Sequence, residues 1–517
     1  MSLRKNPLTD LTTYIQTAVK AIKEITSEEA KEAMISGILE EMSGKEADLA
    51  CDQRGSKQLQ SLLAIVKHDT MIDILCKIIN TDKDCIMNQY CSHVVEAGIQ
   101  SLPKSGSTES PLIGAMLTLL KNDTDSLIKH VCATHCIRSF ILALGGFISL
   151  DKSKQQLELP AQPDGPVMFD DLETVTLQLT PMIAEAPLSL CCHPQAAPTI
   201  QTLLLVLTRH RTDVCANLLN EVADKALAEN LTADTVGSHT LECLLKCAAA
   251  CSKKSFRKFV EGVMSSKSRF AGFALQTAIS SASDEKSFSS IFKNLEISSP
   301  LTPANLAILQ RLAAASGTFP ECKPKIFEKI SSFFGLPLIP KLLTLNNQET
   351  WKSLTSARSS PAGCLLLSTL LKNFPENFAS EAETAANAID WFFKSKNSLR
   401  VVEELISADA PAAARAAFAA AILPKVPDLC IDLERGGSFL VAALWNGAVG
   451  DIALREEISE KLAAVEGLKD VNYKLWRICG LNKSQPQQWH ATQEKIGKAK
   501  NLMDEIFEKS KKRKTSF

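Results

Sequence analysis

The sequence has almost no net charge, no long hydrophobic run and almost no alternation of apolar and polar residues. Its 57 Lys and Arg residues against 58 Asp and Glu create no global positive field that would draw the chain to nucleic acid or to an anionic membrane. The most hydrophobic windows, 137–150 and 410–426, are too short to cross a bilayer. Residues 1–10 are polar and lack the apolar core of a secretory signal. We therefore expect a folded protein without membrane association.

The sequence also lacks the common signatures of metal binding and catalysis. Its 16 cysteines are scattered through apolar stretches, which indicates a reducing compartment. Cys191, Cys192 and His193 are adjacent, without the spaced pairs that a tetrahedral zinc site normally uses. No GxxxxGK(S/T) loop, no GxGxxG loop and no local nucleophile motif is present. We expect a protein that is not an enzyme and that holds no metal and no cofactor.

Apolar residues recur at three- and four-residue spacings along nearly the whole chain, which predicts an all-helical protein. A longer period is superimposed on this pattern. One pattern recurs about every 36 residues, with insertions. It consists of a small residue, one or two polar or ring-bearing residues, two apolar residues and then Gln, Glu or Arg. Because each unit can bury its apolar stripe only against its neighbours, we predict an all-α, curved solenoid of about eleven stacked helical repeats.

The clearest copies of the repeated hexamer are GSKQLQ at 55–60, CSHVVE at 91–96, ATHCIR at 133–138 and GSHTLE at 237–242. Weaker copies end at Gln201, Gln276, Gln310, Ser368, Glu403, Ala442 and Arg477. Three variable positions lie at i, i+1 and i+4 of a helix, and we call them the first, middle and anchor positions. All three can point out of one surface. Stacked units would therefore present polar, flat and cationic side chains that suit the edges and faces of single-stranded RNA bases.

These units resemble the Pumilio (PUF) RNA-binding repeat family, whose units read one base through three such side chains. Over about 50–507 the sequence looks most like the nucleolar protein nine family of small-subunit rRNA-processing factors. The most specific points are the hexamer at 133–138 with Leu144-Gly145-Gly146, the hexamer at 237–242, and Leu475-Trp476-Arg477 with Trp489. The resemblance implies a monomer that binds precursor small-subunit (18S) rRNA, meets pre-ribosomal assembly factors, and acts in rRNA processing and ribosome biogenesis.

The resemblance also implies roles for individual residues. Contacts to base edges would come from first and anchor positions, namely Ser56 and Gln60, Ser92 and Glu96, Thr134 and Arg138, Gln201, Ser238 and Glu242, Gly272 and Gln276, and Arg477. Stacking would come from the middle positions Lys57, His93, His135, His239, Phe273, Arg400 and Lys474. Ser with Glu resembles a guanine reader, and Ser with Gln an adenine reader. We expect Ser238, His239 and Glu242 all to lie on the surface.

Some units depart from this pattern. Pro198 and Ala307 occupy middle positions, and Ser368 and Ala442 occupy anchor positions. These residues cannot make the usual base contacts. We therefore expect a few readable bases, supplemented by shape and phosphate contacts, instead of one base for each repeat.

The spacing of the copies also predicts the domain organisation. We expect an N-terminal helical cap at 1–45, a solenoid at 46–480, and a C-terminal helix with a basic tail at 481–517. Long gaps predict insertions near 151–180, with an exposed loop over 151–171, and near 312–360, as an extra helix pair. The basic run Lys511, Lys512, Arg513 and Lys514 is typical of a nuclear import signal, so with the resemblance we expect the nucleus and nucleolus.

The main alternative is a protein-binding α-solenoid scaffold of the HEAT or armadillo kind. Neutral net charge and the weak copies favour this alternative, whereas the repeated Ser-His-x-x-Glu chemistry favours RNA. The charge along the reading face distinguishes the two, because phosphate contacts supply much of the affinity for RNA. A basic face would favour RNA.

Overall fold

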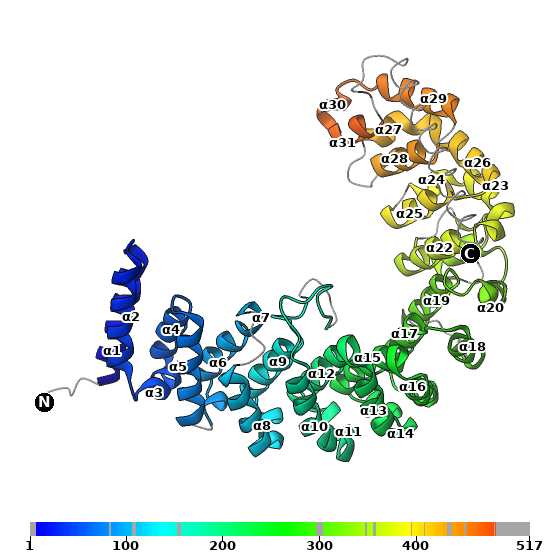
Figure 1. Ribbon diagram of the computed structural model, residues 1–517. Coiled ribbons are helices and arrows are strands. Elements are labelled where there is room, and N and C mark those ends of the chain that lie inside the picture. Colours follow the sequence, from blue (N-terminus) through cyan, green and yellow to red (C-terminus); the bar gives the residue numbers. More distant parts are fainter. Residues whose placement is uncertain are drawn as a thin grey trace, which may run out of the picture. The chain divides into compact units, whose positions relative to one another are not determined.

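The computed structural model describes residues 7–81, 84–105, 110–151, 157–295, 303–346, 349–354, 358–393, 395–407, 409–431, 437–448, 451–479 and 481. Within these ranges every regular element is a helix, which confirms the all-α prediction (Figure 1). No described helix is long and apolar enough to span a membrane. The chain divides into two units, Met1–Glu296 and Ile297–Phe517.

The N-terminal unit consists of two rows of helices (Figure 1). The hexamers lie on one row, in which each helix packs against the next: α4 (Gln53–Leu63), α6 (Cys91–Ile99), α9 (Ala133–Leu144), α12 (Ala196–His210), α15 (Thr235–Cys251) and α17 (Ala271–Ser281). We call these the ladder helices. The outer row is α5 (His68–Thr81), α8 (Pro111–Lys129), α10 (Phe169–Glu185), α13 (Thr212–Val222), α16 (Lys253–Ser265) and α18 (Glu285–Asn294).

Shorter helices complete the unit. Each of these lies directly before or after a ladder helix in the chain: α3 (Glu46–Cys51), α7 (Leu102–Ser105), α11 (Pro187–Cys191) and α14 (Lys225–Leu231). The helices α1 (Pro7–Glu24) and α2 (Glu28–Met42) precede them. α1 packs against both α2 and α4.

The apolar stripe explains why the helices stack. The residue before each anchor is buried in every ladder helix of the N-terminal unit: Leu59, Val95, Ile137, Ile200, Leu241 and Leu275. A stripe of this kind on each helix can be removed from water only by contact with neighbouring repeats. The periodicity of the sequence therefore determines the direction in which the units stack.

The C-terminal unit repeats the arrangement with α19 (Pro303–Ala315), α22 (Pro361–Asn373), α25 (Lys396–Leu405), α28 (Gly437–Gly447) and α31 (Tyr473–Ile478) as ladder helices, each packed against the next. Its other helices are α20 (Lys323–Phe334), α21 (Leu338–Thr344), α23 (Ala379–Asn387), α24 (Ile389–Phe392), α26 (Ala412–Ile422), α27 (Val426–Ile431), α29 (Ile452–Ala463) and α30 (Leu468–Val471). Phe374, Phe378, Phe392 and Phe418 are fully buried in this unit. The domain boundaries given above stay a prediction.

Candidate nucleic-acid interface

A recurring cap marks the start of the ladder helices α4, α6, α12 and α15. The side chain that lies four residues before the first position accepts a hydrogen bond from a backbone N–H. This N–H belongs to the residue just before the first position. The acceptors are Oδ2 of Asp52 (2.7 Å to Gly55), Oδ1 of Asn88 (3.1 Å to Cys91), Nδ1 of His193 (3.3 Å to Ala196) and Oδ1 of Asp234 (2.7 Å to Gly237). Such caps satisfy N–H groups that the first helical turn leaves unpaired. These capping residues are not among the predicted site residues, although Asp and Asn at this spacing are a recognisable signal.

The small residue that opens a hexamer is required for close packing. A Cβ atom on Gly55 would lie 2.4 Å from the carbonyl oxygen of Leu49 in α3, and one on Gly237 would lie 3.0 Å from that of Leu231 in α14. Both distances are too short for a side chain. The two glycines therefore allow α4 and α15 to pack closely against the short helices α3 and α14.

The first positions are buried. Ser56, Ser92, Thr134 and Ser238 are only 3–4% exposed. Each hydroxyl donates to the carbonyl three residues earlier, at 3.3, 3.4, 3.2 and 2.8 Å. The expectation that Ser238 lies on the surface is therefore wrong, because its hydroxyl is paired within the first helical turn.

The middle positions are exposed, as a stacking role requires. Lys57, His93, His135, His239 and Phe273 all present their side chains to solvent. The side chains of His93 and His239 are 65% and 70% exposed. These flat or cationic groups follow one another along the ladder helices except at α12, where Pro198 occupies the middle position, and such groups can stack on bases.

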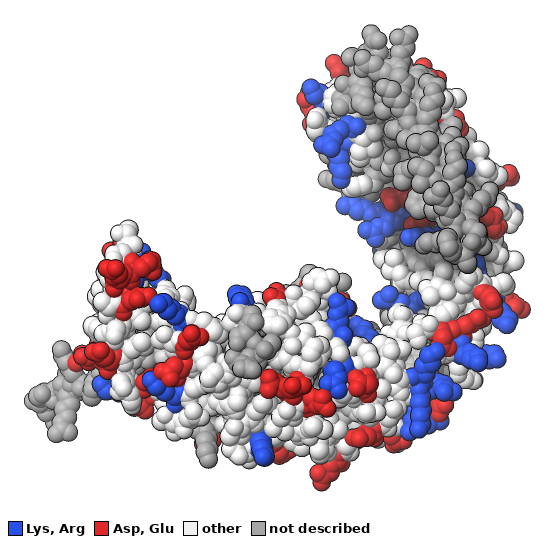
Figure 2. Space-filling view, in the orientation of Figure 1, with Lys and Arg blue, Asp and Glu red and all other residues white. Residues whose placement is uncertain are grey.

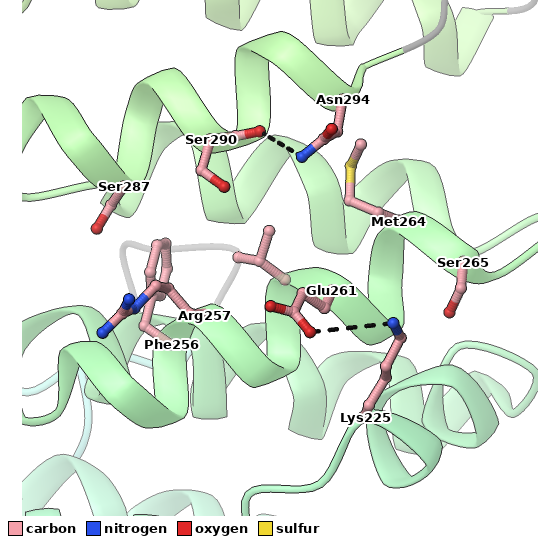
Figure 3. A pocket seen from close by; sticks show the side chains of 10 residues that line it. Lys225, Phe256, Arg257, Glu261, Met264, Ser265, Ser287, Ser290 and Asn294 are labelled. Carbon is pink, nitrogen blue, oxygen red and sulfur yellow. Dashed lines mark hydrogen bonds and ion pairs between the residues drawn. The ribbon is translucent and has the colours of Figure 1, made fainter.

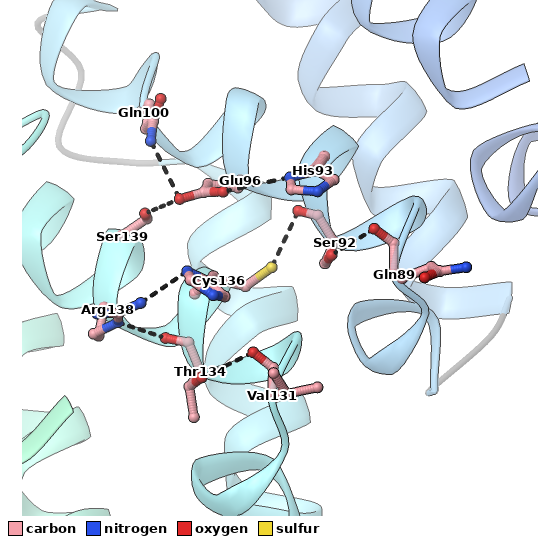
Figure 4. Close-up of polar contacts among 11 residues, drawn as sticks. Gln89, Ser92, His93, Glu96, Gln100, Val131, Thr134, Cys136, Arg138 and Ser139 are labelled. Carbon is pink, nitrogen blue, oxygen red and sulfur yellow. Dashed lines mark hydrogen bonds and ion pairs between the residues drawn. The ribbon is translucent and has the colours of Figure 1, made fainter. Parts of the chain in front are cut away.

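The anchor of α6 connects neighbouring repeats, whereas the anchor of α9 contacts residues of its own helix (Figure 4). Oε1 of Glu96 accepts from the Ser139 hydroxyl of the next ladder helix at 2.9 Å, and Oε2 lies 3.9 Å from Nδ1 of His93. Nη2 of Arg138 lies 2.7 Å from Nδ1 of His135. Burial lowers the pKa of His135, and the charge of Arg138 lowers it further. Both effects favour the neutral form of the imidazole.

The anchors of α12 and α15 also form hydrogen bonds with the next ladder helix. Nε2 of Gln201 donates to Oγ1 of Thr240 at 3.1 Å, and Oε2 of Glu242 accepts from Oγ1 of Thr277 at 3.3 Å. Glu242 is only 9% exposed, so the expectation that it lies on the open surface is wrong. Its carboxylate is turned toward the next repeat, and only its edge faces the hollow described next.

A hollow of about 560 Å³ brings predicted residues of three successive repeats together. Gln201 of α12, Ser238, His239 and Glu242 of α15, and Phe273 of α17 all line it. The carboxylate can accept from a base N–H, the amide can donate or accept, and the imidazole and phenyl rings can stack. This hollow brings together Gln201, Ser238, His239, Glu242 and Phe273 of the predicted residues.

The remaining predicted residues of the N-terminal unit lie on α4 and α17. Gln60 is half-buried in α4, and Gly272 is half-buried in α17. The amide Nε2 of Gln276 is buried and has no hydrogen-bond partner among the described residues. Their roles toward bases stay a prediction.

Exposed cations and aromatics mark the ladder of the C-terminal unit. Arg400 lies exposed on α25, and Lys474 and Arg477 lie exposed on α31. The Lys474 ammonium lies 5.8 Å from the ring centre of Phe439, which is 60% exposed on α28. These groups can contact phosphates and stacked bases. The run 511–514 and Trp489 lie outside the described residues.

Charge differs between the two units (Figure 2). On the ladder of the N-terminal unit, Lys57 and Arg138 are balanced by Glu96 and Glu242. On the C-terminal unit, Lys and Arg gather beside α25 and α31 (Figure 2). Among the residues that the structure describes, no cluster of His, Cys, Asp or Glu could hold a metal ion. Charge therefore favours phosphate contact most clearly at the ladder of the C-terminal unit.

A further hollow of about 320 Å³ lies on the outer row, between α14, α16 and α18 (Figure 3). Its Lys225 ammonium lies 3.9 Å from the Glu261 carboxylate, and Nδ2 of Asn294 donates to the carbonyl of Ser290 at 3.0 Å. It contains none of the residues predicted to contact RNA. The candidate interface is therefore the ladder side of the unit.

The fold and the ladder together define a helical-repeat solenoid of the Pumilio class. The sequence profile described as "NOP9-like PUF repeat domain" matches residues 183–468, which is more than half of the chain. The chain therefore belongs to the NOP9-like PUF repeat family. This membership decides against the HEAT or armadillo alternative.

Individual relatives agree with this assignment. Nucleolar protein 9 of Yarrowia lipolytica is 25% identical, over 94% of this chain and 76% of the relative. Pumilio homolog 23 of Arabidopsis thaliana is 22% identical, over 90% of this chain and 70% of the relative. The solved structure of APUM23 with GGAGUUGACGG matches with a TM-score of 0.70 and 19% identity, over 94% of this chain and 99% of that chain. The structural match confirms the fold.

Proposed function

We propose that this protein is a nucleolar RNA-binding protein that acts, as a monomer and without catalysis, in the processing of small-subunit precursor rRNA. Membership of the NOP9-like PUF repeat family supports RNA binding, and the name of the relatives, nucleolar protein 9, supports a location in the nucleolus. The observation that carries the proposal is the hollow between α12, α15 and α17, where polar anchors lie beside the exposed rings of His239 and Phe273. Association with pre-ribosomal assembly factors is part of the proposal.

The geometry supports a particular way of binding. Because the first positions are buried and the anchors Gln201 and Glu242 are nearly so, the exposed middle residues provide most of the surface that a base can contact, and the anchors contribute only their edges. Bases would stack on successive middle residues, while anchors such as Glu242 offer polar atoms at the base edge. The cations of the C-terminal ladder would contact phosphates. Such binding combines a few read bases with sequence-independent affinity.

The anchors support a role in binding without catalysis. Glu96, Gln201 and Glu242 each bond to a hydroxyl of a neighbouring ladder helix. Acid–base or nucleophilic catalysis would instead require such a group to be paired with a nucleophile or with the proton to be moved. The ladder is thus built to hold its shape while it presents rings and edges.

Crosslinking in cells followed by sequencing of the attached RNA tests the proposal. We expect enrichment of precursor small-subunit rRNA at one or a few places. A variant with His93, His135 and His239 all replaced by Ala keeps the buried residues and should lose much of this enrichment. Recovery from the wild-type protein that is no better than from an untagged control would refute RNA binding in cells.

A further inference from the structure

Charge is distributed unevenly along the outer row of the N-terminal unit. α10 carries four carboxylates and α13 carries two, and neither helix carries Lys or Arg. The next two outer helices reverse this balance, because α16 carries four Lys and Arg residues against one Glu, and α18 carries two Lys against one Glu. Lys and Arg gather over α16 and α18 (Figure 2). The outer row therefore has a basic end, although the whole chain is neutral.

The stability of α16 does not account for its cations. They lie in the first two turns of the helix and all are exposed: Lys253, Lys254, Arg257 and Lys258. Positive charge in the first turn of a helix opposes its macrodipole. Lys253 pairs with Asp284 at 3.2 Å. Nε of Arg257 donates to the carbonyl of Lys253 at 3.4 Å, which uses one of the five N–H donors of the guanidinium and leaves others for a ligand.

An apolar surface lies beside these cations. The hollow of about 320 Å³ between α14, α16 and α18, which we call the outer hollow, is lined on the α16 side by Phe256, Val260 and Met264 (Figure 3). Phe256 and Val260 are almost fully buried, whereas Met264 is half-buried and forms part of the open wall. A methionine side chain is flexible and polarizable, so it adapts to the shape of an apolar group that packs against it.

The outer hollow has a cation near each end. Arg257 lies toward one end and Lys225 toward the other, with Glu261 between them (Figure 3). Nζ of Lys225 lies 3.9 Å from Oε2 of Glu261, and both side chains are more than half exposed. An exposed pair of this kind is weak, and an ammonium group has three N–H donors. Lys225 can therefore accept a second carboxylate as a partner.

We propose that the outer hollow is a docking site for an acidic peptide segment of a partner protein. One apolar side chain of the segment would pack against Met264, and carboxylates on either side of it would pair with Arg257 and Lys225. Further carboxylates would lie along Lys254 and Lys286. The inference rests on the proposed association with other proteins, for which it names the surface and the chemistry of the partner, and it does not require RNA binding.

The observations favour an acidic peptide over RNA at this place. Bases gain affinity by stacking on exposed rings, but Phe256, the ring that lines the outer hollow, is only 2% exposed. The volume of about 320 Å³ is near the lower end of the range of roughly 300–1,000 Å³ for ligand pockets, which suits one or two side chains. Protein interfaces combine an apolar centre with a polar rim, and opposite charge at the rim speeds association.

Selection from a library of random short peptides on the full-length protein tests the chemistry of the ligand. We expect the enriched peptides to carry an excess of Asp and Glu around one or two of Leu, Ile, Phe and Met. The same selection on a variant with Arg257→Glu and Met264→Glu should not enrich them. No enrichment on the wild-type protein, enriched peptides without an acidic excess, or equal enrichment on the variant would each overturn the inference.

Affinity measurements with an enriched peptide test the individual residues. Fluorescence anisotropy should show that Arg257→Ala weakens binding about two- to fivefold and that Met264→Ala weakens it at least about fourfold. Glu261→Gln removes the carboxylate that repels the peptide and should tighten binding. Lys121→Ala, which replaces an exposed lysine on the outer-row helix α8, is the matched control and should leave the affinity unchanged. Urea unfolding checks that each variant is folded.

A parallel measurement with a random-sequence single-stranded RNA pool separates this inference from the proposed function. RNA affinity should be the same for the wild-type protein and for Lys254→Ala and Arg257→Ala. Weaker RNA binding by both variants with unchanged peptide binding would assign the basic end of the row to RNA and overturn the inference, while the proposed function would stand. Peptide binding that depends on Arg257 and Met264, in a protein that binds no RNA, would support the inference and overturn the RNA-binding function.

Discussion

His239 and Glu242 lie within one turn of α15, and their substitutions should separate RNA binding from stability. The His239 side chain is 70% exposed, and that of Glu242 is 12% exposed. Replacing an exposed side chain changes the free energy of unfolding by about 0.5 kcal/mol or less. Loss of one stacking side chain costs about 1–3 kcal/mol of binding, which is roughly a 5- to 150-fold rise in Kd. His239→Ala should therefore weaken RNA binding without unfolding the protein.

Glu242→Ala should act mainly on stability. It removes the carboxylate that accepts from Oγ1 of Thr277, and Thr277 is only 8% exposed. Leaving a buried hydroxyl without its acceptor costs about 1–3 kcal/mol. Glu242→Gln keeps an acceptor oxygen in the same place and should recover most of that loss, so it is the matched control.

Urea unfolding of the full-length variants, followed by circular dichroism, measures the stability change, and fluorescence anisotropy with single-stranded RNA measures the affinity. The reasoning requires a large affinity change with a small stability change for His239→Ala. An equal loss of stability in His239→Ala and Glu242→Ala, with RNA affinity unchanged in the former, would refute the division of roles on α15.

The packing of Gly165, the pKa of His135 and the charge of Arg400 each give a further prediction. Gly165→Ala should destabilise the N-terminal unit by about 1–3 kcal/mol, since its Cβ would lie 1.9 Å from the Pro103 carbonyl oxygen; an unchanged melting temperature would contradict this. Because the pKa of His135 is lowered from its ordinary value of 6.5, the unfolded chain binds more protons just below that pH. Stability should thus fall as pH drops through 6.5, and urea unfolding should show a smaller fall for His135→Gln. Arg400→Ala should reduce the slope of log affinity for RNA against log salt concentration by about one, and an unchanged slope would exclude a phosphate contact there.

Much of the candidate site follows from local sequence pattern. The hexamers locate the middle positions, and exposure of His93, His135 and His239 agrees with their predicted place. The same reasoning failed for Ser238 and Glu242, because it treated one helix as if its whole polar side faced solvent. Burial of these two residues depends on the helices next to α15.

The caps and the contacts of the insertion differ in how far apart in the sequence their partners lie. Asp52 and Asp234 act within a few residues of their own position, so a search for capping patterns in the sequence could have found them. The approach of Glu158 to Lys246 joins residues far apart in the sequence, and no local pattern marks it.

The sequence by itself determined the all-helical fold, the direction of stacking and the identity of the exposed middle residues. These features depend on the period of the α-helix and on the burial of one apolar stripe, which are properties of neighbouring residues. Only the tertiary structure decided which anchors form hydrogen bonds with neighbouring repeats. Glu96, for example, accepts a hydrogen bond from Ser139, which lies 43 residues later in the chain. The tertiary structure also decided where the insertion between α9 and α12 meets the hollow between α12, α15 and α17. Such contacts depend on the distance between successive helices and on the course of the loops between them, and neither is set by residues close together in the chain.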